Sequence, residues 1–207
     1  MNPWLIFGAG GNGVGALTVE LALAENRPVV ALVRHLEAAA RLKAKGVNVF
    51  IGDACDSHIV AQACQAAGAA ATVISTMGGA QDYLAHRTVI DEAEKEGIRR
   101  MILVTSLGCG DSWPFLSARA KAAFGQAVRE KSLAESWLQT STLDFAILRP
   151  GGLQNGEASG KAQRIQQQEV HGFVQRADVA AHIQALASAP ALNQQVYSLV
   201  EPELKPV

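Results

Sequence analysis

The sequence has few of the side chains that transfer protons or hold metals near neutral pH. Its 207 residues include two tyrosines, five histidines and three cysteines, spread along the chain. Cys55, Cys64 and Cys109 lack the CxxC spacing of metal and redox motifs, so we expect reduced thiols in a cytoplasmic protein. The histidines are scattered without ligand spacing, so we expect no metal site.

Clustered charge and long apolar runs are also missing. The net charge is −1 with bases and acids intermixed, whereas a nucleic-acid surface requires clustered Lys and Arg. The N-terminal stretch MNPWLIFGAG has no basic region before its apolar residues, unlike a signal peptide. No apolar run approaches the roughly 20 residues that span a bilayer. We therefore expect neither a nucleic-acid partner nor a membrane partner.

Apolar runs and helical segments alternate regularly over most of the chain. The apolar runs are nearly continuous, which is typical of strands covered on both faces. They are residues 4–7, 29–33, 47–50, 71–75, 100–106 and 145–149, with a last strand at 196–200. The alternation predicts an α/β fold of the Rossmann type, a doubly wound parallel sheet of six to seven strands with helices on both faces.

We interpret residues 1–207 as a single domain, because about half of them are apolar and no linker interrupts the pattern. The alternation breaks after Pro150. Residues 151–176 are polar and rich in glycine, and they predict a loop excursion that forms part of the substrate side.

A glycine motif joins the first strand to the first helix. Residues Gly8, Gly10 and Gly13 fit the pattern G-x-G-x-x-G, with Gly11 and Asn12 between them and Val14 following. In this strand–turn–helix setting, the pattern predicts a dinucleotide whose pyrophosphate lies at the helix N-terminus. The alternative is a tight turn that binds no ligand.

The end of the second strand indicates which dinucleotide is bound. NAD-binding proteins usually carry an acidic residue about 20 residues past the glycines. Here the strand ends in Arg34 and His35, and a guanidinium pairs well with a 2′-phosphate. We therefore expect NADP(H), with NADPH preferred over NADH. The alternative is a solvated arginine at a strand end.

Several stretches together resemble the atypical short-chain dehydrogenase/reductase superfamily, in its NmrA-like, NAD(P)H-binding branch, which includes the flavin/biliverdin reductase B type. They are GAGGNGVG, LVR, GDACD, VISTMGG, LVTSLGCGDSW, TLDFAILRPGGL and RADVAAHI. The glycine loop departs from the branch, being one residue longer than the usual GATGxTG. The resemblance implies cofactor contacts in four turns. Those residues are Asp53 near the adenine, Ser75, Thr76, Met77 and Gly78 along the cofactor, Ser106 with Thr105 at the nicotinamide, and Pro150, Gly151 and Gly152 in the pocket wall.

The wider superfamily uses a Tyr-x-x-x-Lys pair in catalysis. Counting back eighteen residues from Arg149, as the resemblance implies, places the lysine at Lys131, with Glu135 one turn later and Ala127 where the tyrosine would be. Ser106 and Lys131 are then the candidate catalytic residues. Lys131 either holds the nicotinamide ribose or is an exposed lysine paired with Glu135. Neither Tyr83 nor Tyr197 is expected to replace the missing acid.

Without the tyrosine, hydride transfer to a simple ketone lacks a donor for the developing alkoxide. A flavin, quinone or similar conjugated acceptor delocalises the charge and takes its proton from water. The resemblance therefore favours an NADPH-dependent reductase acting on a small conjugated molecule. The alternatives are a non-catalytic NADP-binding redox sensor acting through a protein partner, or an isomerase. A homodimer is also possible from the sequence.

Some further residues carry two interpretations. Trp113 and Phe115 either stack on a planar acceptor or anchor their loop. Cys109 is interpreted as a spectator thiol, since no histidine is placed to activate it. His171 is expected to reach the pocket from the excursion, and Asp178 to cap the helix that follows.

Overall fold

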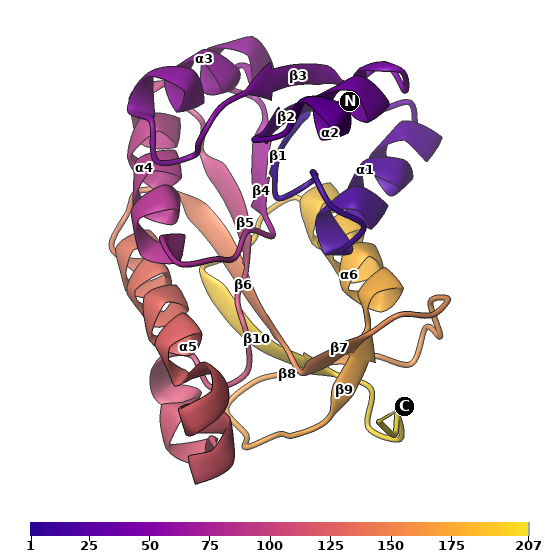
Figure 1. The fold of residues 1–207 in the computed structure, drawn as a ribbon, viewed down its shortest axis with the longest axis vertical. Coiled ribbons are helices and arrows are strands. Elements are labelled where there is room, and N and C mark those ends of the chain that lie inside the picture. The colour runs from indigo at the N-terminus through magenta and orange to yellow at the C-terminus, as the bar shows by residue number, and fades with distance from the viewer. Residues whose placement is uncertain (207) are drawn as a thin grey trace.

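The computed structural model describes residues 1–206, and its centre is one eight-stranded sheet (Figure 1). The order across the sheet is β3-β2-β1-β4-β5-β6-β10-β8. The strands are β1 (Trp4–Phe7), β2 (Val29–Val33), β3 (Asn48–Ile51), β4 (Thr72–Ser75), β5 (Arg100–Val104), β6 (Asp144–Pro150), β8 (Gln163–Ile165) and β10 (Gln195–Val200). Seven of them pair in parallel, so the expected doubly wound sheet is confirmed.

Helices cover both faces of the sheet. They are α1 (Val14–Ala24), α2 (Leu36–Lys43), α3 (Ser57–Ala67), α4 (Asp82–Lys95), α5 (Ala118–Gln139), α6 (Arg176–Ser188) and the short 3-10 helix η1 (Gly110–Phe115). Figure 1 shows α3, α4 and α5 on one side and α1, α2 and α6 on the other. Alternate residues of β1 serve the two sides, because Trp4 and Ile6 belong to one apolar core and Leu5 and Phe7 to the other.

The strand order places a crevice beside β1. The chain winds from β1 to β2 and β3 in one direction and from β4 to β6 in the other. The connections after β1 and β4 therefore leave on opposite faces of the sheet and separate at the carboxyl ends of the strands. In doubly wound sheets, this switch point is where ligands bind.

The excursion at residues 151–176 is not the structureless loop that its composition predicts. Three short strands lie within it, because β7 (Gly152–Gln154) pairs with β9 (Phe173–Gln175), and β8 pairs with β10 in antiparallel fashion. The antiparallel β8 adds an eighth strand at the edge of the sheet. Strands of three residues are too short to show a periodicity in sequence, and their partners are distant, so their formation depends on tertiary contacts.

Asp178 anchors this excursion instead of capping α6. It is the third residue of α6, and the residue at the N-cap position is Gln175. Its buried carboxylate accepts hydrogen bonds from the Ser159 amide at 2.9 Å, the Ser159 hydroxyl at 3.2 Å and the Gly160 amide at 2.8 Å. The interpretation of Asp178 as structural is supported, but the expected cap is wrong because the carboxylate points to a loop that is distant in sequence.

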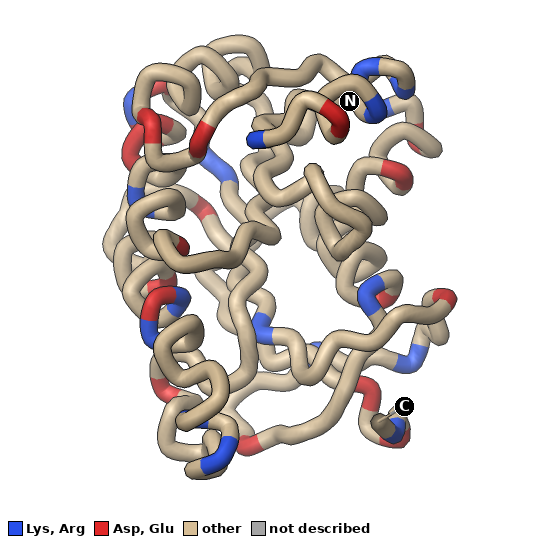
Figure 2. The backbone as a smooth tube through the Cα atoms, in the orientation of Figure 1, with Lys and Arg blue, Asp and Glu red and all other residues tan. Residues whose placement is uncertain are grey.

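The molecule shows no face of a single charge in the view of Figure 2, where Lys and Arg alternate with Asp and Glu along the outer helices. Among residues 1–206, no helix combines the length and apolar character needed to cross a membrane.

Replacing Asp178 with Ala should destabilise the protein by about 2–3 kcal/mol, because hydrogen bonds to a buried carboxylate are lost together. Urea unfolding measures this change. Glu203→Ala, which removes an exposed carboxylate near the C-terminus, is the control and should stay within about 0.5 kcal/mol of the wild type. An Asp178→Ala protein as stable as this control would contradict the anchoring role.

Candidate functional site

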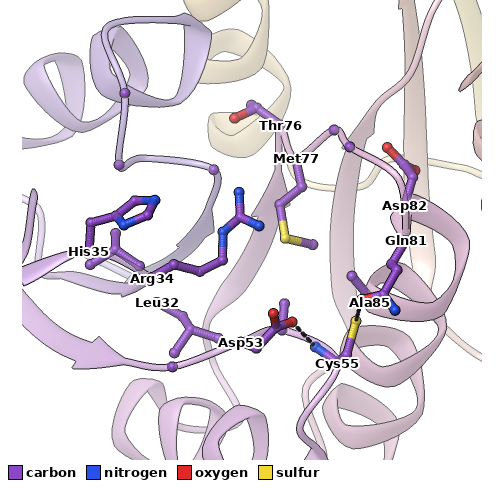
Figure 3. A pocket seen from close by; sticks show the side chains of 18 of the residues that line it. Leu32, Arg34, His35, Asp53, Cys55, Thr76, Met77, Gln81, Asp82 and Ala85 are labelled. Atoms are coloured by element: carbon purple, nitrogen blue, oxygen red, sulfur yellow. Dashed lines mark hydrogen bonds between the residues drawn. The ribbon is translucent and has the colours of Figure 1, made fainter.

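A cavity of about 660 Å³ opens at the carboxyl ends of β1 to β4, as the strand order predicts. Four segments line it, one after each of these strands, and Figure 3 shows their side chains. The lining residues are Gly8, Gly10, Gly11, Leu32, Val33, Arg34, His35, Gly52, Asp53, Ala54, Cys55, Thr76, Met77, Gly78, Gly79, Ala80, Gln81, Asp82 and Ala85.

Two glycines let the first helix approach the first strand closely. Gly8 has a φ of +93°, and a Cβ placed on it would lie 2.5 Å from Thr76 Oγ1. A Cβ on Gly15 would lie 2.4 Å from the Gly8 carbonyl oxygen. Neither position accepts a side chain without displacing the backbone. Gly15 ends the stretch GAGGNGVG, but no role was predicted for it because it lies beyond the G-x-G-x-x-G pattern.

The remaining glycines of the loop leave space for a ligand. A Cβ on Gly11 or Gly13 would meet nothing within 4 Å, and Asn12 between them is exposed. Gly13 is the N-cap of α1, and no side chain caps that end of the helix. The first amides of α1, starting at the buried Val14, therefore lack the side-chain acceptor that usually satisfies them. Such a helix end fits the pyrophosphate of a dinucleotide.

Arg34 is the basic side chain that β2 brings to the cavity. Figure 3 shows it extending between Asp53 and Met77. It is exposed and has no hydrogen-bond or ion-pair partner within residues 1–206. Asp53 itself accepts a hydrogen bond from the Cys55 amide at 2.8 Å. That bond, with a smaller effect of Arg34, holds the pKa of Asp53 below its ordinary value.

Arg41 is a second cation at this rim that sequence reasoning missed. Its guanidinium, carried by α2, donates to the Gly10 carbonyl at 2.8 Å and is exposed. A carbonyl does not neutralise the charge, so Arg34 and Arg41 together make the rim beside the glycine loop positive. Arg41 gave no motif signal, because only the packing of α2 against the loop brings it there.

The turn after β4 is only partly in the cavity. Thr76, Met77 and Gly78 line it, as the resemblance implies. Ser75 does not, because it is fully buried and its hydroxyl lies 2.7 Å from His86 Nε2.

Lys131 reaches this same turn and not Glu135, so of its two interpretations the pairing with Glu135 along α5 is wrong. Its ammonium donates to the Met77 carbonyl and to Asp82 Oδ2, both at 2.8 Å. Burial favours the neutral form of Asp82, but the neighbouring His86 and Lys131 outweigh it, and the pKa of Asp82 lies below its ordinary value. Ala127, one turn before Lys131, is exposed.

Glu135, one turn after Lys131 on α5, is instead part of a buried network with Thr105 and Arg149. Arg149 Nε and Nη2 donate to its two carboxylate oxygens at 3.0 and 2.7 Å, and the Thr105 hydroxyl donates to the same carboxylate at 2.6 Å. Burial alone would lower the pKa of Arg149, but the contact with Glu135 raises it above its ordinary value. Arg149 also pairs with the exposed Asp111 of η1. The Thr105 side chain therefore has an internal role.

The other residues implied by the resemblance lie outside the lining of the 660 Å³ cavity. Ser106 donates to the Leu107 carbonyl at 3.0 Å. Pro150 ends β6, and Gly151 and Gly152 allow β7 to pass close to Gly172 and Phe173. A Cβ on Gly151 would lie 2.3 Å from the Gly172 carbonyl oxygen. The structure therefore explains Gly151 and Gly152 by the close approach of the Gly172–Phe173 segment.

The remaining residues with two interpretations lie outside the lining of the main cavity. Cys109 is buried, and burial raises the pKa of its thiol to about 12, consistent with a spectator. Trp113 packs on Gly125 and under Lys121, which supports its role as a loop anchor. His171 does not reach the main cavity. It pairs with Glu169 and, with Phe115, borders a much smaller hollow between the excursion and the segment that follows β5.

The geometry fits a dinucleotide, because the cleft is lined by Gly8, Gly10, Gly11 and by Arg34, which has no partner within residues 1–206, and the uncapped start of α1 follows the same glycine loop. Comparisons with known proteins agree. A family model described as NAD(P)H-binding matches residues 8–190. The solved structure of ChuY, described as an anaerobillin reductase from Escherichia coli O157:H7, is 78% identical, covers 100% of both chains and has a TM-score of 0.98.

Two curated relatives are more distant. Sanguinarine reductase of Eschscholzia californica is 33% identical over 119 residues, which are 55% of this chain and 42% of that protein. YhfK of Bacillus subtilis, an uncharacterised sugar epimerase, is 26% identical over 218 residues, covering 95% of this chain and 94% of its own. The resemblance drawn from the motifs is confirmed, and the chain belongs to the NAD(P)H-binding family.

Proposed function

We propose that this protein is an NADPH-dependent reductase that passes a hydride to a small conjugated acceptor. The observation that carries the proposal is a cleft lined by the glycine loop and Arg34 that fits the phosphate and adenosine part of a dinucleotide. With it goes Ala127 at the position where, by the resemblance, the superfamily's proton donor would stand. An acceptor that delocalises the incoming charge does not require that donor. The description of the 78% identical relative as a reductase supports the same reaction class.

The residues of the cleft have separate tasks in this proposal. The amides at the start of α1 hold the pyrophosphate, and Gly11 and Gly13 let it approach the backbone. Arg34, with Arg41 beside it, pairs with the 2′-phosphate, and Asp53 lies at the adenosine end. Thr76, Met77 and Gly78 run along the cofactor toward Ser106 and the nicotinamide.

The bound nicotinamide supplies the hydride, and the chain's contribution is orientation. The thiol in the cleft, Cys55, is not ready to react, because burial raises its pKa to about 11. Proton delivery from water then suffices for a conjugated product. We propose anaerobillin as the first acceptor to test, following the relative's description, and flavin or quinone as further members of the class.

Arg34→Ala should weaken the affinity for NADPH by about ten- to a hundredfold while changing that for NADH much less, because a bidentate pair with the 2′-phosphate is lost. Titration calorimetry with each nucleotide measures both affinities. Arg87→Ala is the matched control, since Arg87 lies on α4 over the Trp137 ring and away from the cleft. An unchanged NADPH-to-NADH ratio in Arg34→Ala would refute the specificity role.

The purified protein should oxidise NADPH, followed by absorbance, when anaerobillin is added, and FMN or a quinone should support a slower reaction. An aliphatic ketone should give only the background rate, because no donor meets its alkoxide. Reduction of the ketone would overturn the argument from delocalisation. NADPH binding without oxidation by any acceptor would instead favour the non-catalytic redox sensor, which the missing tyrosine also fits.

A further inference from the structure

We infer that Lys131 and Asp82 are positioning residues, which hold the turn between β4 and α4 in place as part of a closed ring of polar contacts. The inference deepens the proposed NADPH-dependent function and rests on it for its effect on cofactor affinity. The turn in question is residues 76–81, which follows β4 and forms one wall of the cofactor cleft.

The ring starts and ends at the Ser75 hydroxyl. Ser75 Oγ lies 2.7 Å from His86 Nε2, and His86 Nδ1 lies 2.8 Å from the Asp82 carbonyl and 2.9 Å from Asp82 Oδ1. Asp82 Oδ2 accepts from Lys131 Nζ at 2.8 Å, and Lys131 Nζ donates to the Met77 carbonyl at 2.8 Å. The Met77 amide closes the ring by donating to Ser75 Oγ at 3.4 Å.

Burial makes these contacts strong and the ring intolerant of losing a member. Ser75 and His86 are fully buried, and the side chains of Asp82 and Lys131 are 1% and 16% exposed. A buried carboxylate that loses its cation remains in a medium that solvates it poorly. Within residues 1–206, Lys131 supplies the Lys or Arg side chain that forms an ion pair with Asp82.

Other contacts hold mainly the two ends of the turn. The Thr76 amide and hydroxyl donate to the Phe7 carbonyl at 3.0 and 3.3 Å, Met77 packs against an apolar core, and the Cys55 thiol donates to Gln81 at 3.7 Å. Gly78, Gly79, Ala80 and Gln81 are exposed. Two of these residues have no side chain to pack, and Gly79 adopts a φ of +137°. The Met77 backbone is held on both sides, through its amide by Ser75 and through its carbonyl by Lys131. The ring therefore adds to the packing of Met77 at the wall that the cofactor is proposed to lie along.

This geometry gives Lys131 a different task from that of the superfamily lysine. With no tyrosine at Ala127, there is no phenol whose pKa it would lower. Two of its three hydrogen-bond donors already point to protein acceptors on one turn. Lys131 thus affects cofactor binding by holding the turn in place. Removing the charge of Asp82 should therefore weaken NADPH binding as much as removing the lysine does.

The test combines hydrogen exchange of residues 76–81 in the ligand-free protein with calorimetric titration of NADPH. We expect Lys131→Met and Asp82→Asn each to speed exchange in this turn and to raise the NADPH Kd by about tenfold. The double variant should be no worse than either single one, because both remove the same ion pair. Lys131→Arg, which keeps a cation, should recover most of the affinity.

Lys45→Met is the matched control, since Lys45 makes an ion pair with Glu20 in which both side chains are exposed, and it should change neither readout. Normal exchange and NADPH affinity in Lys131→Met, with a reduced kcat, would overturn the inference and make the lysine a catalytic group. Additive losses in the double variant would also overturn it. If wild type fails to bind NADPH, the proposed function falls, while the exchange data still decide whether the ring holds the turn.

Discussion

The contact between Gly15 of α1 and the Gly8 carbonyl is the constraint on which the cleft depends. It brings the uncapped start of α1 against the carboxyl end of β1, where a Cβ would lie 2.4 Å from that oxygen. Because β2 and β4 flank β1 and their connections leave on opposite faces, the space beside the glycine loop stays open. Every other part of the proposed cofactor site is arranged around this junction.

The two walls of the cleft obtain their rigidity in different ways. The wall after β1 is fixed by backbone contact between glycines, while the wall after β4 is fixed by buried side chains around Met77. Charges follow the same division. Asp82 is paired with Lys131 and Glu135 with Arg149 inside the protein, whereas Arg34 is left without a partner within residues 1–206 at the rim. Unbalanced positive charge therefore lies where a phosphate would supply the balance.

Local patterns in the sequence were sufficient for the framework. Strands at 4–7 and 29–33 were predicted with their observed limits, and Gly8, Gly10, Gly11 and Arg34 line one cavity, whereas Asn12, Gly13 and Val14 lie outside its lining. Contacts between distant residues were not predictable. Lys131 and Asp82 are 49 positions apart and Asp178 and Ser159 are 19 apart, so each pairing depends on how two helices or a loop pack. For Lys131, the helical spacing suggested Glu135, but Arg149 from the neighbouring strand occupies that carboxylate.

These internal pairings also limit the chemistry that the site performs. Thr105 donates to Glu135, Ser75 is enclosed with His86, and Lys131 is held by Asp82 and Met77. These side chains lie near the carboxyl ends of β4 and β5, and each is already hydrogen-bonded within the protein. Ala127 carries only a methyl group. A site of this kind orients the cofactor and the acceptor, but it offers no side chain that donates a proton to an alkoxide. In the proposed reaction, the acceptor itself must therefore stabilise the charge that arrives with the hydride, which is why we expect a conjugated substrate for this site.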